Sequence, residues 1–299
     1  MKNDNQLIAG IELGGTKTIA LIARGTEILD EFRIPSTSPE EVLEPVSNWL
    51  KKAREKYDFK AIGIASFGPV CLDKNSPEFG FITATPKPNW SNTDVIGSVK
   101  KWFDGPIGFD TDVNGAGLAE YYWGASQNCD TSIYVTIGTG LGGGIIANGV
   151  PLHGFMHPEM GHMRIRRNHQ HDFKGACPFH GDCIEGLVCG PAIKARTGKP
   201  AEELMKEDPI WEILADEIAE FLTNLIYVAS PRKILIGGGV MHDKEYFFQK
   251  IRNNINDKLG NYIHDLDLSA LGEMIIPPKL GDKAGPLGAI ALGIAALEK

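Results

Sequence analysis

The sequence lacks the features that mark membrane-spanning, disulfide-stabilised and nucleic-acid-binding proteins. No apolar run approaches the roughly 20 residues that a membrane-spanning helix needs. Five cysteines in 299 residues are few and odd in number, which argues against a disulfide framework and favours a reducing compartment. The formal net charge of −8 disfavours a nucleic-acid surface. The polar N-terminus leads directly into a strand pattern, so we expect no signal peptide, and a cytoplasmic protein without membrane or nucleic-acid partners.

Short β-rich segments alternate with helical patterns along the chain, which predicts an α/β fold. A three-strand meander is expected within residues 6–34, and single strands are expected at 61–68, 106–112 and 233–240. Helices are expected within residues 39–56, 113–125 and 208–229 and after Gly285. A chain of this length exceeds one compact core and suits two lobes.

Residues 133–152 repeat the pattern of residues 9–28 when one segment is displaced by 124 positions. The matching pairs are Ile11 and Val135, Leu13 and Ile137, Gly14 and Gly138, Ile22 and Ile146, and Gly25 and Gly149. Strand, glycine turn, strand and glycine turn recur without a gap. Chance is the alternative, because Gly and Ile are common residues. The repeat predicts one architecture used twice, with a cleft between two similar lobes.

The two glycine turns do not fit the standard nucleotide-binding motifs. Gly10 and Gly15 have P-loop spacing, but Thr16 follows where that motif requires Lys. Residues 138–143 satisfy GxGxxG, but a strand pattern follows where a dinucleotide site needs a helix. We therefore interpret both as β-hairpin turns.

Hairpin glycines can still bind phosphate, because their backbone N–H groups approach it without an intervening Cβ. Lys17 adds a positive charge, and Thr16 and Thr139 add hydroxyl donors. Plain turns are the alternative. Further glycine turns at residues 237–239 and 281–285 favour phosphate binding over that alternative.

Two carboxylates near residue 110 are candidates for a catalytic base. Phosphoryl transfer is mostly positioning and charge neutralisation, with one carboxylate beside the accepting hydroxyl. Asp112 lies where an expected strand meets a helix, and open α/β sheets place ligands at such carboxyl ends. Its alternative role is a helix N-cap. Asp110 shares the same strand face and could be the base or a support for it.

A cluster of metal-binding side chains lies between residues 161 and 183. Cys177, His180 and Cys183 follow one another at intervals of three residues, and His162 would complete a tetrahedral set. Two thiolates and two imidazoles with no open position describe a structural zinc site rather than a catalytic one. His169 and His171 compete for the fourth position, and a solvated His-rich loop is the alternative. The ligands would fix two neighbouring carboxylates, Glu159 and Glu185.

These motifs resemble the ROK family of bacterial sugar kinases and related repressors, in the actin-like ATPase superfamily. "ELGGTK" at 12–17 is similar to the family's first phosphate loop, and "IGTGLGGGI" at 137–145 to its second. "HPEMGHM" at 157–163 resembles the sugar-binding segment and "CPFHGDCIEG" at 177–186 the zinc segment. The likeness runs nearly from end to end.

Within that family the chain resembles the fructokinase branch. "TPKPNW" at 85–90, "DTDVN" at 110–114 and the Cys-x2-His-x2-Cys pattern carry this likeness. Glucokinases of the family usually have three cysteines in the zinc segment and an Asn before the catalytic Asp. Thr111 occupies that Asn position, which disfavours glucose as the best substrate.

The resemblance implies a role for each matching residue. Asp112 becomes the general base, and Glu159, His162 and Glu185 become sugar ligands. His162, Cys177, His180 and Cys183 become the zinc ligands. Glu12, where many relatives have Asp, becomes the residue that handles Mg²⁺. The nucleotide site then comprises Gly14, Gly15, Thr16, Lys17, Gly138, Thr139, Gly140, Gly237, Gly238, Gly239, Gly281 and Ala284.

The resemblance also implies a duplicated, actin-like (ribonuclease H-like) fold of two α/β lobes. One lobe would span residues 1–112 and 285–299, and the other residues 113–284. The implied reaction is ATP- and Mg²⁺-dependent phosphorylation of fructose to fructose 6-phosphate by a homodimer. Glucose, mannose and an N-acetylated hexosamine are the alternative substrates. A sugar-sensing repressor is disfavoured, because the phosphate loop begins near residue 10 and leaves no room for a helix-turn-helix.

Overall fold

The computed structural model describes residues 5–167 and 172–298, which form two compact units. The first unit takes the chain up to residue 127, residues 150–157 and the chain from residue 282, and the second takes residues 128–149 and 158–281. No helix in the described ranges has the length and apolar character to cross a membrane.

The first unit is built on a sheet whose strands lie in the order β3-β2-β1-β4-β7. The strands are β1 (Leu7–Leu13), β2 (Lys17–Arg24), β3 (Glu27–Pro35), β4 (Ala61–Ser66) and β7 (Ile107–Thr111). The meander β1-β2-β3 is antiparallel, whereas β4 and β7 run parallel to β1. A small ribbon of β5 (Phe81–Ile82) and β6 (Thr93–Asp94) lies beside the sheet.

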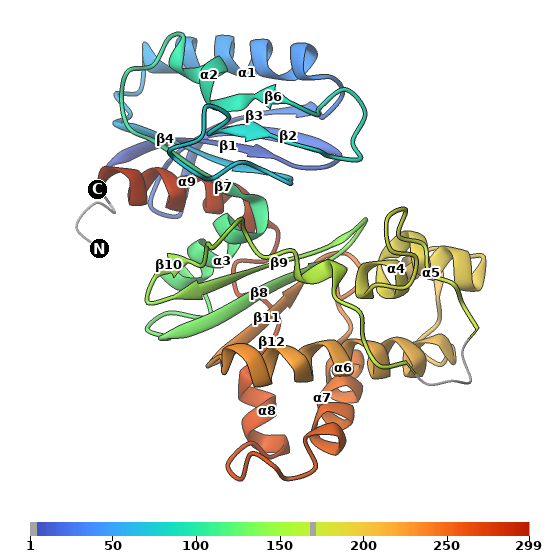
Figure 1. Ribbon diagram of the computed structural model, residues 1–299. Helices are drawn as coiled ribbons and strands as arrows, with labels where there is room; N and C mark the ends of the chain where they lie inside the picture. The colour runs from blue at the N-terminus through green and yellow to red at the C-terminus, as the bar shows by residue number, and fades with distance from the viewer. Residues whose placement is uncertain (1–4, 168–171, 299) are drawn as a thin grey trace. The chain divides into compact units, whose positions relative to one another are not determined.

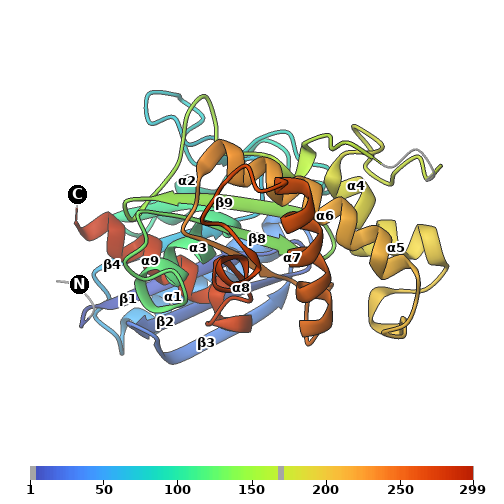
Figure 2. The ribbon, with the colours of Figure 1, turned by 90° about the horizontal axis from the view of Figure 1, so that it is seen from below.

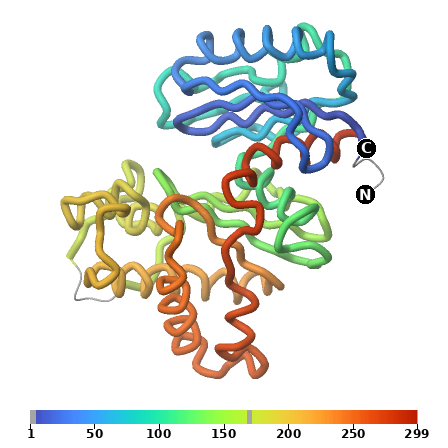
Figure 3. Tube along the Cα trace, turned by 180° about the vertical axis from the view of Figure 1, so that it is seen from behind, coloured from blue at the N-terminus to red at the C-terminus, as the bar shows by residue number. Residues whose placement is uncertain are grey.

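Helices cover both faces of this sheet. Helices α1 (Pro39–Arg54) and α2 (Val95–Lys100) lie over one face, and α9 (Ala284–Leu297) lies along the other (Figures 1 and 3). The close packing of α9 against the sheet depends on Gly63 in β4, because a Cβ there would lie 1.7 Å from the Ala289 carbonyl oxygen. Every residue of β4 is buried, as expected for a strand covered on both faces.

The domain boundary differs from the predicted one. The expected break after residue 112 would place α3 (Asp112–Trp123) in the second lobe, but the structure keeps it in the first unit. The reason is a close helix crossing: a Cβ on Gly288 of α9 would lie 2.5 Å from the Gly115 carbonyl carbon of α3. The segment at 150–157, which begins with β10 (Val150–Pro151), also returns to the first unit.

The second unit contains a sheet with the order β9-β8-β11-β12. Its strands are β8 (Thr131–Ile137), β9 (Leu141–Ala147), β11 (Lys233–Gly237) and β12 (Ile275–Ile276). Its helices are α4 (Ile184–Val188), α5 (Gly190–Thr197), α6 (Ile210–Ala229), α7 (Glu245–Leu259) and α8 (Leu268–Met274). Helix α7 packs against the long α6, and both contribute to one apolar core with β8 and β11 (Figure 2).

The predicted duplication is present in the strand order. In each unit an antiparallel hairpin, β1-β2 or β8-β9, pairs through its first strand with a parallel strand, β4 or β11. The expectation of a repeat without a gap is wrong by one residue. Leu13 pairs with Thr18, but the matching Ile137 pairs with Leu141, so the second turn is one residue shorter. The displacement is therefore 124 residues along the first strand and 123 along the second.

Candidate active site

The turn between β7 and α3 holds Asp112 without using it as a cap. The N-cap of α3 is Thr111, whose Oγ1 accepts the Asn114 backbone N–H at 3.1 Å. Asp112 occupies the first helical position, and its Oδ1 accepts the Val113 N–H at 2.9 Å. The N-cap alternative for Asp112 is therefore excluded. Burial raises the pKa of Asp112 to about 6, a value suited to a base that must also release its proton.

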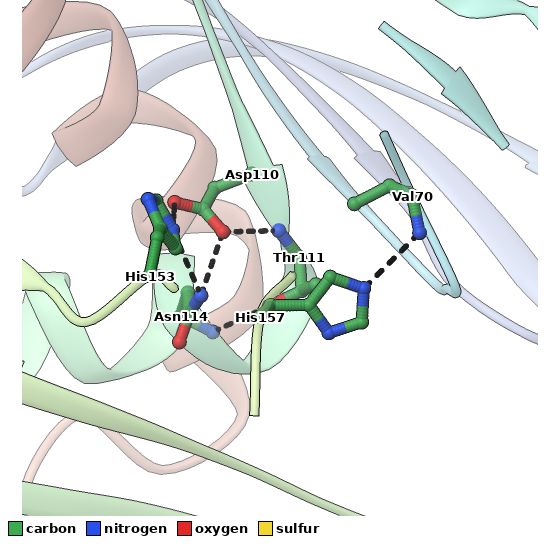
Figure 4. A network of polar contacts seen from close by, with 6 residues as sticks. All are labelled: Val70, Asp110, Thr111, Asn114, His153 and His157. Atoms are coloured by element: carbon green, nitrogen blue, oxygen red, sulfur yellow. Dashed lines mark hydrogen bonds and ion pairs between the residues drawn. The ribbon is translucent and has the colours of Figure 1, made fainter. Parts of the chain in front are cut away.

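Asp110 is buried and fully engaged, which assigns it a supporting role. Its Oδ1 accepts the Thr111 N–H at 2.8 Å and the Asn114 Nδ2–H at 2.7 Å. Its Oδ2 lies 2.8 Å from Nε2 of His153, a residue that our sequence analysis did not select. With donors on both oxygens, this carboxylate holds the turn (Figure 4).

Glu12 on β1 forms an electrostatic pair with Asp112. Burial and the neighbouring Asp112 raise the pKa of Glu12 to about 7. Its Oε2 is buried and has no hydrogen-bond partner among the described residues. Gly285 is required beside it, because a Cβ there would lie 2.0 Å from the Glu12 Oε1. Two close carboxylates and an unpartnered buried oxygen fit a cation such as Mg²⁺.

The first glycine turn is closed by its own backbone and joined by a lysine from elsewhere. The Gly14 N–H donates to the Lys17 carbonyl at 3.1 Å, and a Cβ on Gly15 would meet nothing within 4 Å. Lys87 donates from Nζ to the Gly15 carbonyl at 2.6 Å and lies over the Phe67 ring. Lys87 belongs to the "TPKPNW" segment at 85–90, and no role was predicted for it. The turn therefore has two lysines near it.

The second glycine turn is tied to one of the predicted sugar ligands. Oε2 of Glu185 accepts the Leu141 N–H at 3.0 Å, and a Cβ on Gly140 would lie 2.8 Å from that same oxygen. The Gly190 N–H donates to the Gly138 carbonyl at 2.7 Å, which fixes the turn to the start of α5. A side chain at position 140 would therefore press on the Glu185 carboxylate.

The remaining residues of the predicted nucleotide site are four glycines in the second unit, at 237–239 and 281, and Ala284 in the first. Gly237 ends β11, and Gly238 has a φ of +92°, where a Cβ would lie 2.3 Å from the Ile137 carbonyl oxygen. Gly281, with a φ of +53°, belongs to the second unit, whereas Ala284 begins α9 in the first.

The four predicted metal ligands come together in the second unit. His162 from the short helix η1 (Met160–His162), Cys177, His180 and Cys183 place their ligand atoms within 4.8 Å of one another. Nδ1 of His162 lies 3.8 Å from Sγ of Cys177 and 3.6 Å from Sγ of Cys183. A tetrahedral zinc site with ordinary bond lengths has N···S edges of about 3.6 Å. The donor set and spacing therefore fit zinc.

The cluster leaves the other nitrogen of His162 for another partner, because Nδ1 is the atom that faces the two thiols. Glu159 precedes η1, and its carbonyl accepts the His162 N–H at 3.0 Å. Burial raises the pKa of the Cys183 thiol to about 11, so a bound cation is what would favour its thiolate. The competing ligands His169 and His171 lie outside the described residues.

The predicted site residues occur in both units. The first unit holds Asp112, Asp110, Glu12 and the first glycine turn. The second holds Glu159, Glu185, the metal cluster, the second glycine turn and the glycines that follow β11.

Comparison with known proteins gives consistent matches over the whole chain. The sequence profile described as "ROK family" matches residues 8–296. A fructokinase of Zymomonas mobilis is 46% identical over 100% of both chains. A fructokinase of Pediococcus pentosaceus is 38% identical over 98% of this chain and 99% of its own.

Among solved structures, a ROK family glucokinase from Streptomyces griseus, in complex with glucose and AMPPNP, is 25% identical with a TM-score of 0.75. The alignment covers 96% of this chain and 99% of that one. The predicted fold class, a duplicated α/β fold of the actin-like type, is confirmed by this likeness together with the repeated sheet order.

Proposed function

The chain belongs to the ROK family, and on that premise we propose that it is an ATP-dependent fructokinase that phosphorylates the 6-hydroxyl of fructose. The observation that carries the choice of sugar is the 46% identity to the Zymomonas mobilis fructokinase over the full length of both chains. The geometry of the first unit independently favours phosphoryl transfer, since a carboxylate excluded from capping interacts with a second carboxylate, Glu12, which directly precedes the first glycine turn in the chain.

Asp112 is the base in this proposal. Its carboxylate accepts the proton of the attacking sugar hydroxyl as the phosphoryl group is transferred. The pKa of about 6 keeps most of it deprotonated at neutral pH while leaving it basic enough to take a proton. Asp110 is excluded from this role, because its two oxygens already accept hydrogen bonds from the turn and from His153.

The glycine turns and Glu12 serve the nucleotide. The Gly14 and Gly138 N–H groups close their own turns, so the backbone N–H groups of Gly15, Thr16, Thr139 and Gly140 would serve the phosphates, with Lys17 adding charge. Glu12 would hold Mg²⁺, through water or directly, with its unpartnered Oε2. When bound, the ion neutralises charge on the transferred phosphoryl group. The glycines after β11, with Gly281 and Ala284, are assigned to the adenosine.

The metal cluster serves the sugar. His162, Cys177, His180 and Cys183 would hold zinc with no position left for substrate, so the ion would supply no chemistry to the transfer. It would fix the short segment that carries Glu159, His162 and Glu185. We assign these three to the sugar hydroxyls, with the His162 Nε2 as a donor.

A coupled assay of ADP production across a sugar panel tests the proposal. Fructose should give the highest kcat/KM among fructose, glucose, mannose and N-acetylmannosamine. A higher kcat/KM with any other sugar would overturn the assignment of fructose while leaving the kinase intact. No ADP production with any of the four would overturn the kinase itself.

A homodimer in the cytoplasm completes the proposal and rests on the family resemblance. Sedimentation velocity at micromolar concentration should give twice the mass of the 32.5 kDa chain. A single species with the mass of one chain would contradict it.

A further inference from the structure

The segment at 150–157 is fastened to the first unit by two histidines. Nε2 of His157 accepts the Val70 backbone N–H at 3.1 Å, and Nε2 of His153 lies 2.8 Å from the Asp110 Oδ2 (Figure 4). His157 is buried, and about a third of the His153 side chain is exposed. Between them, Phe155 is fully exposed and marks the outer side of the segment.

The contact with Asp110 completes the hydrogen bonding of a buried carboxylate. A carboxylate in such a place is stable only when its oxygens are paired. The Thr111 N–H and the Asn114 amide both bond to Oδ1, so Oδ2 depends on His153 among the described residues. The short distance to a carboxylate also assigns the proton of His153 to Nε2.

The same hydrogen bonds define the backbone around Asp112. Asn114 donates its amide to Asp110 and its backbone N–H to Thr111, which closes the turn from two sides. Asp112 lies between these bonded residues. Any rotation of Asp110 would therefore release the Asn114 amide and change the path of residues 111–114.

We propose that His153 is a positioning residue for phosphoryl transfer, because it holds Asp110 and thereby fixes the turn that aims the Asp112 carboxylate. The proposal rests on the proposed kinase function. It assigns a mechanistic role to a residue that lies 41 positions beyond Asp112 in the chain and that neither glycine-turn nor zinc motif includes.

The test compares His153→Ala with His153→Gln in the full-length enzyme. His153→Ala leaves Oδ2 of Asp110 without its donor, so kcat for fructose should fall about 10–100-fold, the scale expected for a misplaced catalytic group. The KM values for fructose and ATP should change less than about threefold, because His153 belongs to neither the proposed sugar ligands nor the proposed nucleotide site. His153→Gln keeps an amide donor and should recover most of the lost kcat.

Phe155→Ala is the matched control on the same segment and should keep wild-type kcat, since its side chain contacts solvent. Asp110→Asn should also lower kcat, and adding His153→Ala to it should lower kcat no further, because both changes break one contact. Thermal unfolding checks that each variant is folded.

Three results would overturn the inference. They are a folded His153→Ala enzyme with wild-type kcat, a raised fructose KM with unchanged kcat, and full additivity of the two substitutions. The second of these would make His153 a sugar ligand instead. Failure of the proposed function is a separate observation, because the wild-type enzyme itself would then produce no ADP with fructose.

Discussion

Around Asp112 the chain is fixed by hydrogen bonds, whereas around His162 four candidate metal ligands converge. The β7–α3 turn satisfies Asp110 and caps α3 entirely with protein donors. The metal cluster brings two thiols and two imidazoles within 4.8 Å, an arrangement that protein atoms alone do not stabilise. The first region is therefore expected to keep its geometry without any ion, and the second to lose it.

The difference separates two tasks that a sugar kinase must perform. The base needs a fixed direction and a tuned pKa, which a buried hydrogen-bonded turn provides. The proposed sugar-binding segment forms no helix or strand at residues 163–167 and 172–183, the part between η1 and α4 that the structure describes, so it needs a cross-link to become rigid. A metal bound by four protein ligands would provide that cross-link without taking part in the chemistry.

The largest expected effect is a loss of kcat on substitution of Asp112, in the hydrogen-bonded β7–α3 turn. Asp112→Asn removes the base but preserves its size, so kcat should fall about 10²–10⁴-fold with little change in the affinity for fructose or ATP. Steady-state kinetics and calorimetric binding measure the two quantities. An active Asp112→Asn enzyme beside an inactive Asp110→Asn enzyme would mean that Asp110 is the base.

The next largest effect is expected on zinc content and stability when a ligand of the metal cluster is replaced. Cys177→Ser should abolish the expected single zinc per chain and lower the melting temperature, because binding energy of the metal contributes to folding. Cys189→Ser is the matched control, since Cys189 is also buried but lies outside the cluster. Elemental analysis and thermal unfolding report both quantities. A wild-type protein without zinc would refute this assignment.

A smaller effect is expected at the second glycine turn. Gly138→Val should fold normally, because only the Gly239 N approaches a Cβ there, at 4.0 Å. It should weaken ATP binding about tenfold, equivalent to roughly 1.4 kcal/mol, by obstructing the phosphates. Gly140→Ala should in addition raise the fructose KM, since its Cβ would press on Glu185. Equal ATP affinity in folded Gly138→Val protein would leave the turn a plain hairpin.

The smallest effect is a change in stability with pH. The folded protein keeps a proton on Glu12 up to about pH 7, while the unfolded chain releases it near 4.5. The folded state thus binds more protons between these values, so the free energy of unfolding falls as pH rises through that window. Glu12→Gln should therefore raise the melting temperature at pH 8 by a few degrees.

At pH 4 that gain should vanish, because Glu12 is then protonated in both states. The control is Glu27→Gln at an exposed position, which should change neither value. A Glu12→Gln protein with a lower melting temperature than the wild type at pH 8 would contradict the assignment of Glu12 as a buried carboxyl with a raised pKa.

Local patterns in the sequence were sufficient for most of the fold and for the metal cluster. Strand and helix segments were found because their periodicity is local, and Cys177, His180 and Cys183 because they occupy seven consecutive residues. Asp112 was selected as a candidate base, beside Asp110, from the place where a strand ends. Each of these signals is contained in a short stretch of chain.

Contacts between distant segments were missed because no short stretch of the sequence contains both partners. Lys87 meets Gly15 across 72 residues, and His153 lies near Asn114 across 39. No spacing rule links such residues. The helix α3 was assigned to the wrong lobe because its partner, α9, is the last helix of the chain, and only the Gly115–Gly288 crossing reveals the pairing. The two histidines of "HGFMH" at 153–157, four residues apart, were the one available signal for His153.

The most direct measurement is calorimetric titration of the metal-stripped, folded protein with fructose and, separately, with a non-hydrolysable ATP analogue. The account predicts that fructose binding weakens at least about tenfold, because Glu159, His162 and Glu185 lose their common anchor. ATP-analogue binding should stay within about twofold of the zinc-loaded protein, and added zinc should restore fructose binding. Unchanged fructose affinity without zinc would contradict the division between a hydrogen-bonded base and a metal-fixed sugar segment.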